Sequence, residues 1–127
     1  MPELQNAKKI AEFEDKSLLI VDDDNPFRER LSRAMEKKGF IVTQAEGVKK
    51  GIDCVTVKKP AFAVIDLRLG DGNGLEVVKK IQNSQDLNIK SRIIMLTGYG
   101  NISTAVAAIK EGAIDYLAKP ADADDVE

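Results

Sequence analysis

The fold is decided by one stretch of the chain, which reads Phe62-Ala63-Val64-Ile65-Asp66-Leu67-Arg68-Leu69-Gly70-Asp71-Gly72-Asn73-Gly74. Four apolar residues lead directly into Asp66, and such a run, when turn residues follow it, is typical of a buried β-strand. Asp66 then lies at the carboxyl end of the strand, where open α/β sheets place their working residues. Aspartate is also common in turns and helix caps. This stretch alone therefore leaves both a structural and a functional interpretation of Asp66 open.

Apolar runs and amphipathic segments alternate along the rest of the chain. The apolar runs predict five strands, at Ser17–Val21, Phe40–Ala45, Ala61–Asp66, Arg92–Thr97 and Ile114–Ala118. Helical spacing between them predicts four helices, at Pro26–Lys38, Gly47–Lys59, Gly74–Ser84 and Ile102–Glu111. Apolar strands joined by helices form a parallel sheet that is covered on both faces. We therefore predict a flavodoxin-like, doubly wound α/β fold with strand order 2-1-3-4-5, in which the polar second strand lies at one edge.

The first predicted helix carries its own boundary signals. Asn25 is a residue type that caps helices, and Pro26 is favoured at the first helical position. Gly39 follows the last apolar position and predicts the end of the helix. The sequence thus predicts Asn25 as the capping residue of this helix.

The two ends of the chain differ from the regular pattern between them. Residues 1–16 are predicted to be an N-terminal extension, either a short amphipathic helix or a loosely ordered tail. Residues 17–127 are predicted to form the single domain. Little sequence follows Lys119-Pro120, so we expect the fifth helix of the fold to be largely missing from this chain and the domain to be C-terminally truncated.

The composition excludes several kinds of chemistry. The 127 residues contain no histidine, which rules out a Ser-His-Asp triad, a Cys-His pair and a histidine metal site. Cys54 is the single cysteine; it cannot form an internal disulfide, and we interpret it as a packed side chain in a cytoplasmic protein. The net charge is -2, no basic run exceeds two residues and no apolar run could span a bilayer. We therefore expect neither direct nucleic-acid binding nor membrane insertion.

Five polar residues follow the predicted strands, at positions that meet at one edge of a parallel sheet. They are Asp22 and Asp23 after the first strand, Asp66, Thr97, and Lys119 after the fifth strand. Clustered carboxylates repel one another unless a cation lies between them, and Mg²⁺, or Mn²⁺ in its place, prefers such oxygen ligands. Aspartate is a known covalent acceptor in phosphoryl transfer, which requires positioning and charge neutralisation. Each residue alone is compatible with an ordinary turn or cap, but together they favour a phosphoryl-transfer site.

The chain resembles the receiver domain of two-component response regulators, from about Ser17 to its end. The resemblance rests on four stretches in this order: Leu19-Ile20-Val21-Asp22-Asp23-Asp24, Val64-Ile65-Asp66-Leu67, Leu96-Thr97-Gly98 and Tyr116-Leu117-Ala118-Lys119-Pro120. The sequence from Asp66 to Leu75, together with Leu96-Thr97-Gly98-Tyr99-Gly100, is most similar to the RegA/PrrA/ActR subgroup of redox-response regulators. The resemblance implies a CheY-like fold.

The resemblance also implies roles for the residues at the sheet edge. Asp66 would be the phosphoacceptor. Mg²⁺ would be held by Asp23, Asp66 and the backbone carbonyl of Arg68, with Asp22 acting through a bound water. Lys119 would contact the phosphoryl group.

Two residues of the family pattern would report the phosphorylated state, and two would affect how long it lasts. Thr97 would hydrogen-bond the phosphoryl group and move inward, and Tyr116 would be the aromatic switch. We further hypothesise that the large side chains of Arg68 and Tyr99 screen the acyl phosphate from water and slow its hydrolysis.

The family resemblance implies partners as well. The phosphoryl donor would be a sensor histidine kinase, and the chain would catalyse only its own phosphorylation and dephosphorylation. The output would be a C-terminal helix-turn-helix DNA-binding domain outside this chain, with a possible homodimer through the face formed by helix four, strand five and helix five.

Three other functions would also use parts of this pattern. A stand-alone receiver could act as a protein-binding adaptor or a phosphorelay intermediate. An aspartate-nucleophile phosphohydrolase would need an acidic residue where this chain has Arg68. A flavodoxin-like cofactor carrier would need a phosphate-binding loop where Asp22-Asp23-Asp24 would repel phosphate unless a metal intervened.

Overall fold

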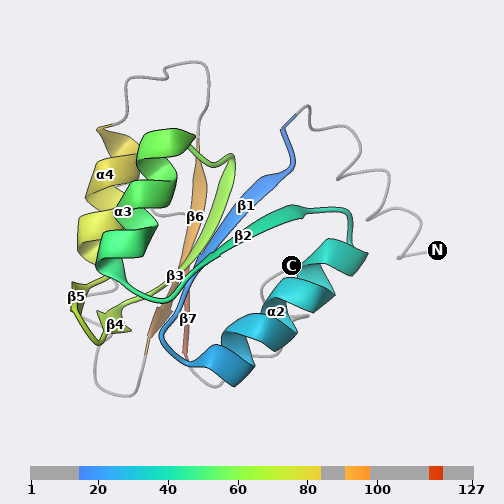
Figure 1. Ribbon diagram of the computed structural model, residues 1–127, viewed down its shortest axis with the longest axis horizontal. Helices are drawn as coiled ribbons and strands as arrows, with labels where there is room; N and C mark the ends of the chain where they lie inside the picture. Colours follow the sequence, from blue (N-terminus) through green and yellow to red (C-terminus); the bar gives the residue numbers. More distant parts are fainter. Residues whose placement is uncertain (1–14, 84–90, 98–114, 119–127) are drawn as a thin grey trace.

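A five-stranded parallel sheet forms the centre of the protein. The structure is a computed structural model that describes residues 15–83, 91–97 and 115–118, and of residues 97 and 115–118 only the backbone. The strands are β1 (Ser17–Val21), β2 (Ile41–Ala45), β3 (Phe62–Asp66), β6 (Arg92–Thr97) and β7 (Asp115–Ala118). They are arranged in the order β2-β1-β3-β6-β7 and every neighbouring pair is parallel (Figure 1). The predicted doubly wound, CheY-like order is therefore confirmed.

Helices cover both faces of this sheet (Figure 1). Helix α2 (Asn25–Lys37) lies on one face, and α3 (Val48–Val57) and α4 (Leu75–Gln82) lie side by side on the other. Because successive side chains of a strand point to opposite faces, β1 contributes to two separate apolar cores. Leu18 and Ile20 pack in the core beneath α2, whereas Leu19 and Val21 pack in the core beneath α3 and α4.

The sequence predicted the described elements well and their ends less well. Strands Ser17–Val21 and Arg92–Thr97 have the predicted bounds, and the other predicted helices and strands that the structure describes differ by one or two residues at one or both ends. The second predicted helix ends two residues earlier than predicted, because Lys58 already adopts an extended conformation two residues before Pro60. The helix predicted at 102–111, most of the predicted extension at 1–16 and the segment 119–127 lie outside the described residues.

The prediction that Asn25 caps the first helix was wrong. Asp24 is the N-cap, and its Oδ1 accepts a hydrogen bond from the Phe27 N–H at 3.1 Å. Asn25 is the first helical residue, and its Oδ1 accepts a hydrogen bond of 2.7 Å from Arg28 instead. Both residue types cap helices, so the local sequence could not distinguish between them. The other end agrees with the prediction, since Gly39 has a left-handed φ of 103° directly after the C-cap.

A two-stranded hairpin directly after Asp66 was not predicted. Strands β4 (Arg68–Leu69) and β5 (Gly72–Asn73) pair antiparallel. Gly72 has a φ of 153°, which a residue with a side chain adopts only under strain. The dipeptide Asp71-Gly72, at the end of the turn and the start of β5, is a common hairpin signal that could have revealed the turn.

The same hairpin supplies the N-terminal cap of α3. Gly47 occupies the N-cap position of this helix and offers no side chain, and the first turn contains no acidic residue. Asp71 takes over this role, because its Oδ1 accepts the Val48 N–H at 2.7 Å and its Oδ2 accepts the Lys49 N–H at 3.1 Å. These two backbone hydrogen bonds, that from Val48 above all, hold the pKa of the Asp71 carboxyl below its usual value.

The lowered pKa of Asp71 predicts a specific pH dependence of stability. A carboxyl whose pKa is lower in the folded protein contributes stability that is present above its unfolded pKa of about 4 and is lost as the pH falls through the folded pKa. We expect Asp71→Asn to lower the free energy of unfolding at neutral pH, and the difference from the parent protein to shrink only below about pH 4. Urea unfolding between neutral and acidic pH measures this.

The matched control is Asp53→Asn, which removes an exposed carboxylate from the same helix without touching the cap. Glu46, the nearby carboxylate that interacts with the charge of Asp71, is present in the parent and in both variants. A difference between the parent and Asp71→Asn that stays constant down to the most acidic pH would contradict the prediction.

Candidate functional site

Three carboxylates converge at the carboxyl edge of the sheet, as the sequence predicted. Asp22, Asp23 and Asp66 each offer an oxygen, and these oxygens lie within 4.8 Å of one another. Asp22 and Asp66 are only 0% and 4% exposed, whereas Asp23 is exposed to solvent. The cluster therefore has a buried floor and one open side.

The register of the parallel strands explains why these residues meet. Val21 pairs with Ile65, so that Asp22 and Asp66 follow neighbouring positions of β1 and β3. Asp66 pairs with Leu96, and Thr97 follows at the end of β6, where it pairs with Ala118 of β7. Thr97 is therefore placed at the carboxyl edge of the sheet, as the sequence predicted.

Four predicted site residues are placed only in part or not at all. The side chains of Thr97 and Tyr116 are not among those described, and Tyr99 and Lys119 lie outside the described residues. The sheet register nevertheless brings Ala118, the residue before Lys119, alongside Thr97. Their proposed roles stay predictions.

Hydrogen bonds hold the loop that carries Asp22 and Asp23. The Asp22 N–H donates to the carbonyl of Ala45 at 3.1 Å, and Asp22 Oδ1 accepts the Asp24 N–H at 2.9 Å. Arg28 Nη1 donates to the Asp22 carbonyl at 2.8 Å, while its Nε donates to Gln44 Oε1 of β2 at 3.0 Å. Arg28 therefore ties this acidic loop to the end of the edge strand, a role that no local sequence signal indicated.

Asp66 is the last residue of β3 and lies close to the start of α4. Its Oδ1 accepts the Arg68 N–H at 3.2 Å, and the Leu67 N–H donates to the Leu96 carbonyl at 2.9 Å. Gly74, the N-cap of α4, donates its N–H to the Leu67 carbonyl at 2.8 Å. A Cβ on Gly74 would overlap the backbone oxygen of Asp66. The helix thus begins directly against the strand end that carries the carboxylate.

The cluster fits a small divalent cation. Carboxylate oxygens are hard ligands, the kind that Mg²⁺ and Mn²⁺ prefer, and Mg²⁺ in particular uses one or two protein carboxylates together with water. Asp23 and Asp66 could supply these ligands, with Asp22 beside them. The side chain of Arg68 is exposed, and its predicted contribution is the backbone carbonyl.

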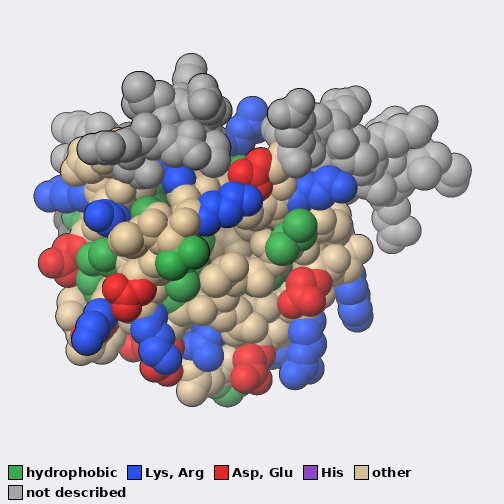
Figure 2. All heavy atoms as spheres, turned by 45° about the horizontal axis from the view of Figure 1, so that its top comes forward, with side chains coloured by type: hydrophobic (Ala, Val, Ile, Leu, Met, Phe, Trp, Pro, Cys, Tyr) green, Lys and Arg blue, Asp and Glu red, His purple; other side chains and the backbone are tan. Residues whose placement is uncertain are grey.

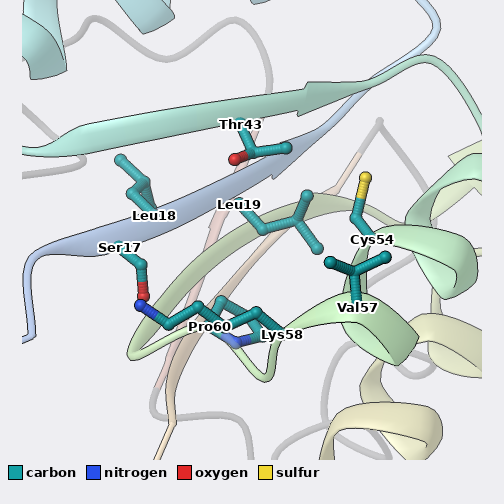
Figure 3. A pocket seen from close by; sticks show the side chains of 8 residues that line it. All are labelled: Ser17, Leu18, Leu19, Thr43, Cys54, Val57, Lys58 and Pro60. Atoms are coloured by element: carbon teal, nitrogen blue, oxygen red, sulfur yellow. The ribbon is translucent and has the colours of Figure 1, made fainter.

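A cavity of about 220 Å³ lies at the opposite end of the sheet and has a different character (Figure 3). Its lining comes from β1, β2, α3 and the segment before β3, and comprises Ser17, Leu18, Leu19, Thr43, Cys54, Val57, Lys58 and Pro60. Cys54 packs against the core, and burial raises the pKa of its thiol. This agrees with the interpretation of Cys54 as a packing residue, because a raised pKa makes a thiol less reactive.

Comparison with known proteins identifies the family. A family model described as "Response regulator receiver domain" matches residues 18–127. The chain belongs to this family. Two curated relatives are similar to it over 88% of its length: the acid tolerance regulatory protein ActR of Sinorhizobium medicae, at 61% identity, and the photosynthetic apparatus regulatory protein RegA of Rhodobacter capsulatus, at 59%. The similarity to the ActR and RegA subgroup that the sequence indicated is therefore confirmed.

The curated relatives are longer than this receiver chain, and their matches cover 56% and 59% of their own lengths. Among solved structures, a response regulator from Burkholderia pseudomallei is 38% identical, with a TM-score of 0.78 over 88% of this chain and 64% of that one. That structure is described as having a phosphorylated aspartic acid, a calcium ion and citrate.

The surface of the receiver chain is charged with both signs. Figure 2 shows lysine and arginine side chains interspersed with aspartate and glutamate over the visible face. In the part of the chain that the structure describes, no helix has the length and apolarity that a membrane crossing requires. The absence of direct nucleic-acid binding stays a prediction.

The close approach of α4 to Asp66 predicts that Gly74 cannot be replaced. In Gly74→Ala the new methyl group would overlap the backbone of Asp66 and lie 2.9 Å from Ile65 Cγ2. We expect the free energy of unfolding, measured with urea, to fall by about 1–3 kcal/mol, the usual cost of overpacking.

Gly70→Ala is the matched control for this prediction. A Cβ at Gly70 would meet only Asp23 Oδ2, at an ordinary contact distance of 3.8 Å. Equal unfolding free energies for the two variants would show that the contact at Gly74 is not a constraint.

Proposed function

We propose that this receiver domain accepts a phosphoryl group on Asp66 from a sensor histidine kinase, with Mg²⁺ bound at the acidic cluster. The observation that carries the proposal is the convergence of Asp22 and Asp23 on the buried Asp66. It is supported by the phosphorylated aspartic acid and the calcium ion described for the relative from Burkholderia pseudomallei.

The chemistry requires an ionised Asp66. One of its oxygens forms a new P–O bond as the P–N bond of a phosphohistidine breaks, and the donor imidazole nitrogen keeps the bonding electron pair. Asp23, Asp66 and the Arg68 carbonyl would hold the cation, with Asp22 acting through water. The chemistry that a cation held there would supply is neutralisation of charge on the phosphoryl group.

The remaining groups at the sheet edge would stabilise and report the product. Lys119 would neutralise a phosphoryl oxygen, and the Thr97 hydroxyl would donate a hydrogen bond to another. Inward movement of Thr97 would leave space for Tyr116 and shift an existing two-state equilibrium. In this proposal the chain acts on no other molecule and catalyses only its own phosphorylation and dephosphorylation.

The output would be transcriptional. The names of the curated relatives describe regulatory proteins, and those proteins extend well beyond the matched region. We propose that a C-terminal helix-turn-helix domain in the full-length protein reads the phosphorylated state, with dimerisation through the face that contains β7. A cytoplasmic location agrees with the single cysteine of the chain.

Phosphorylation with a small-molecule donor tests the central claim. We expect acetyl phosphate and Mg²⁺ to add one phosphoryl group to the intact chain, measured by mass spectrometry, and Asp66→Asn or chelation with EDTA to abolish the adduct. Asp53→Asn, which removes an exposed carboxylate far along the sequence on α3, should be phosphorylated normally. A parent chain that gains no phosphoryl group, or an adduct that persists in Asp66→Asn, would refute the proposal.

The lifetime of the phosphoryl group tests the roles proposed for Arg68 and Tyr99. If these side chains exclude water from the acyl phosphate, the double variant Arg68→Ala, Tyr99→Ala should lose its phosphoryl group several-fold faster than the parent. The decay is followed by mass after removal of the donor. Arg33→Ala, which removes an exposed arginine from α2, is the control. Equal decay rates for the double variant and the parent would remove both residues from the mechanism.

A further inference from the structure

The β4–β5 hairpin lies between the acidic cluster and the N-terminus of α3. On one side, a Cβ at Gly70 would lie 3.8 Å from Asp23 Oδ2, so the hairpin turn adjoins the exposed carboxylate of the cluster. On the other side, the next residue, Asp71, accepts the backbone N–H groups of Val48 and Lys49. The turn thus connects the cluster to a helix that is remote in sequence.

The hairpin is also attached at its base. The Arg68 N–H donates to Asp66 Oδ1, and at the other strand Asn73 Oδ1 accepts the Leu75 N–H of α4 at 2.8 Å. The base is therefore held by α4 and by Asp66 itself. The tip of the hairpin, Gly70-Asp71, is held by the contact of Asp71 with α3.

Close packing at the tip requires two glycines. A Cβ at Gly47 would lie 2.6 Å from Asp71 Oδ1, and the three atoms nearest to it would all belong to the Asp71 carboxylate. A Cβ at Gly72 would lie 2.7 Å from Glu76 Oε2. The backbone of α3 thus approaches Asp71 more closely than a side chain at position 47 would permit.

We propose that Asp71 is a positioning residue for the acidic cluster. By accepting two hydrogen bonds at the positive end of the α3 dipole, it fixes the hairpin and with it the Arg68 backbone carbonyl beside Asp66. A ligand that is already in place binds a metal more tightly than one that must be ordered on binding. This inference rests on the proposed function, because it concerns the affinity of the cluster for Mg²⁺.

Thermodynamic linkage gives the inference a second consequence. If the cap on α3 favours metal binding, metal binding must strengthen the cap by the same factor. The amides of Val48 and Lys49, which donate to Asp71, should therefore exchange more slowly with solvent when Mg²⁺ is present. In Asp71→Ala this protection by Mg²⁺ should disappear.

The experiment must separate positioning from simple helix capping. Asp71→Ala removes both the helix cap and the support of the hairpin. It should lower the midpoint of urea unfolding and weaken Mg²⁺ binding, measured by NMR titration, several-fold. Gly47→Ser added to Asp71→Ala gives α3 a cap of its own, because residue 47 has an extended backbone at the N-cap position. A side chain at position 47 fits in this double variant, since the Asp71 carboxylate that it would otherwise meet has been removed. We expect this double variant to regain stability but not Mg²⁺ affinity.

A matched control removes the effect of charge alone. Glu46→Gln eliminates a negative charge at the residue before Gly47, close enough to Asp71 for the two carboxylates to interact, and leaves the hairpin untouched. Its Mg²⁺ affinity should stay close to that of the parent. A loss as large as that in Asp71→Ala would mean that Asp71 acts only through its charge, and would overturn the inference.

The remaining outcomes distinguish this inference from the proposed function. If the parent binds Mg²⁺ and Asp71→Ala binds it equally well, or the double variant recovers the parent affinity, positioning by Asp71 is overturned while the metal site stands. If the parent itself does not bind Mg²⁺, the proposed function fails. Amide hydrogen exchange without metal reports on the hairpin independently. The backbone amides of Leu69 and Asn73 should exchange faster with solvent in Asp71→Ala and in the double variant than in the parent.

Discussion

The parallel register of β1, β3 and β6 is the constraint on which the site depends. A carboxylate cluster is electrostatically unfavourable, and no local sequence preference would assemble it. The apolar cores on both faces of the sheet fix the register, because slipping a strand by one residue would exchange the side chains of the two faces. The same packing that buries Ile20 and Val21 therefore forces Asp22 beside Asp66.

The sequence predicts those parts of the fold that follow from periodicity. Strands β3 and β6 are continuous apolar runs, and helices α2 to α4 have apolar residues at helical spacing. Each pattern is local, so these elements can be predicted without knowing what they pack against. The convergence of Asp22, Asp23 and Asp66 could be predicted from their positions at the carboxyl ends of two predicted parallel strands. The family resemblance added roles for Thr97, Tyr116 and Lys119 that the described residues do not test.

The contacts that the sequence did not reveal join residues far apart in the chain. Asp71 caps a helix whose first residue, Val48, lies 23 residues earlier in the sequence, and Arg28 of α2 donates a hydrogen bond to Gln44 of β2. Neither residue differs in type from its exposed neighbours, so only the folded geometry identifies it. The prediction of Asn25 as the cap, where the structure has Asp24, failed for a related reason, since two equivalent residues compete for one position. Both contacts hold a loop of the acidic cluster to neighbouring elements, since Arg28 binds Gln44 near the end of β2 and Asp71 binds the first turn of α3.

The contact between Gly74 and the backbone of Asp66 bears on how the protein folds. The two residues are close in sequence, so bringing them together costs little chain entropy. The strand β3, its hairpin and α4 can therefore form as one local unit, whereas Asp22 reaches Asp66 only after β1 has paired across a long intervening segment. The turn after Asp66 is thus built from short-range contacts, and the acidic neighbours of Asp66 arrive with the long-range contacts, which form later in proteins of mixed topology.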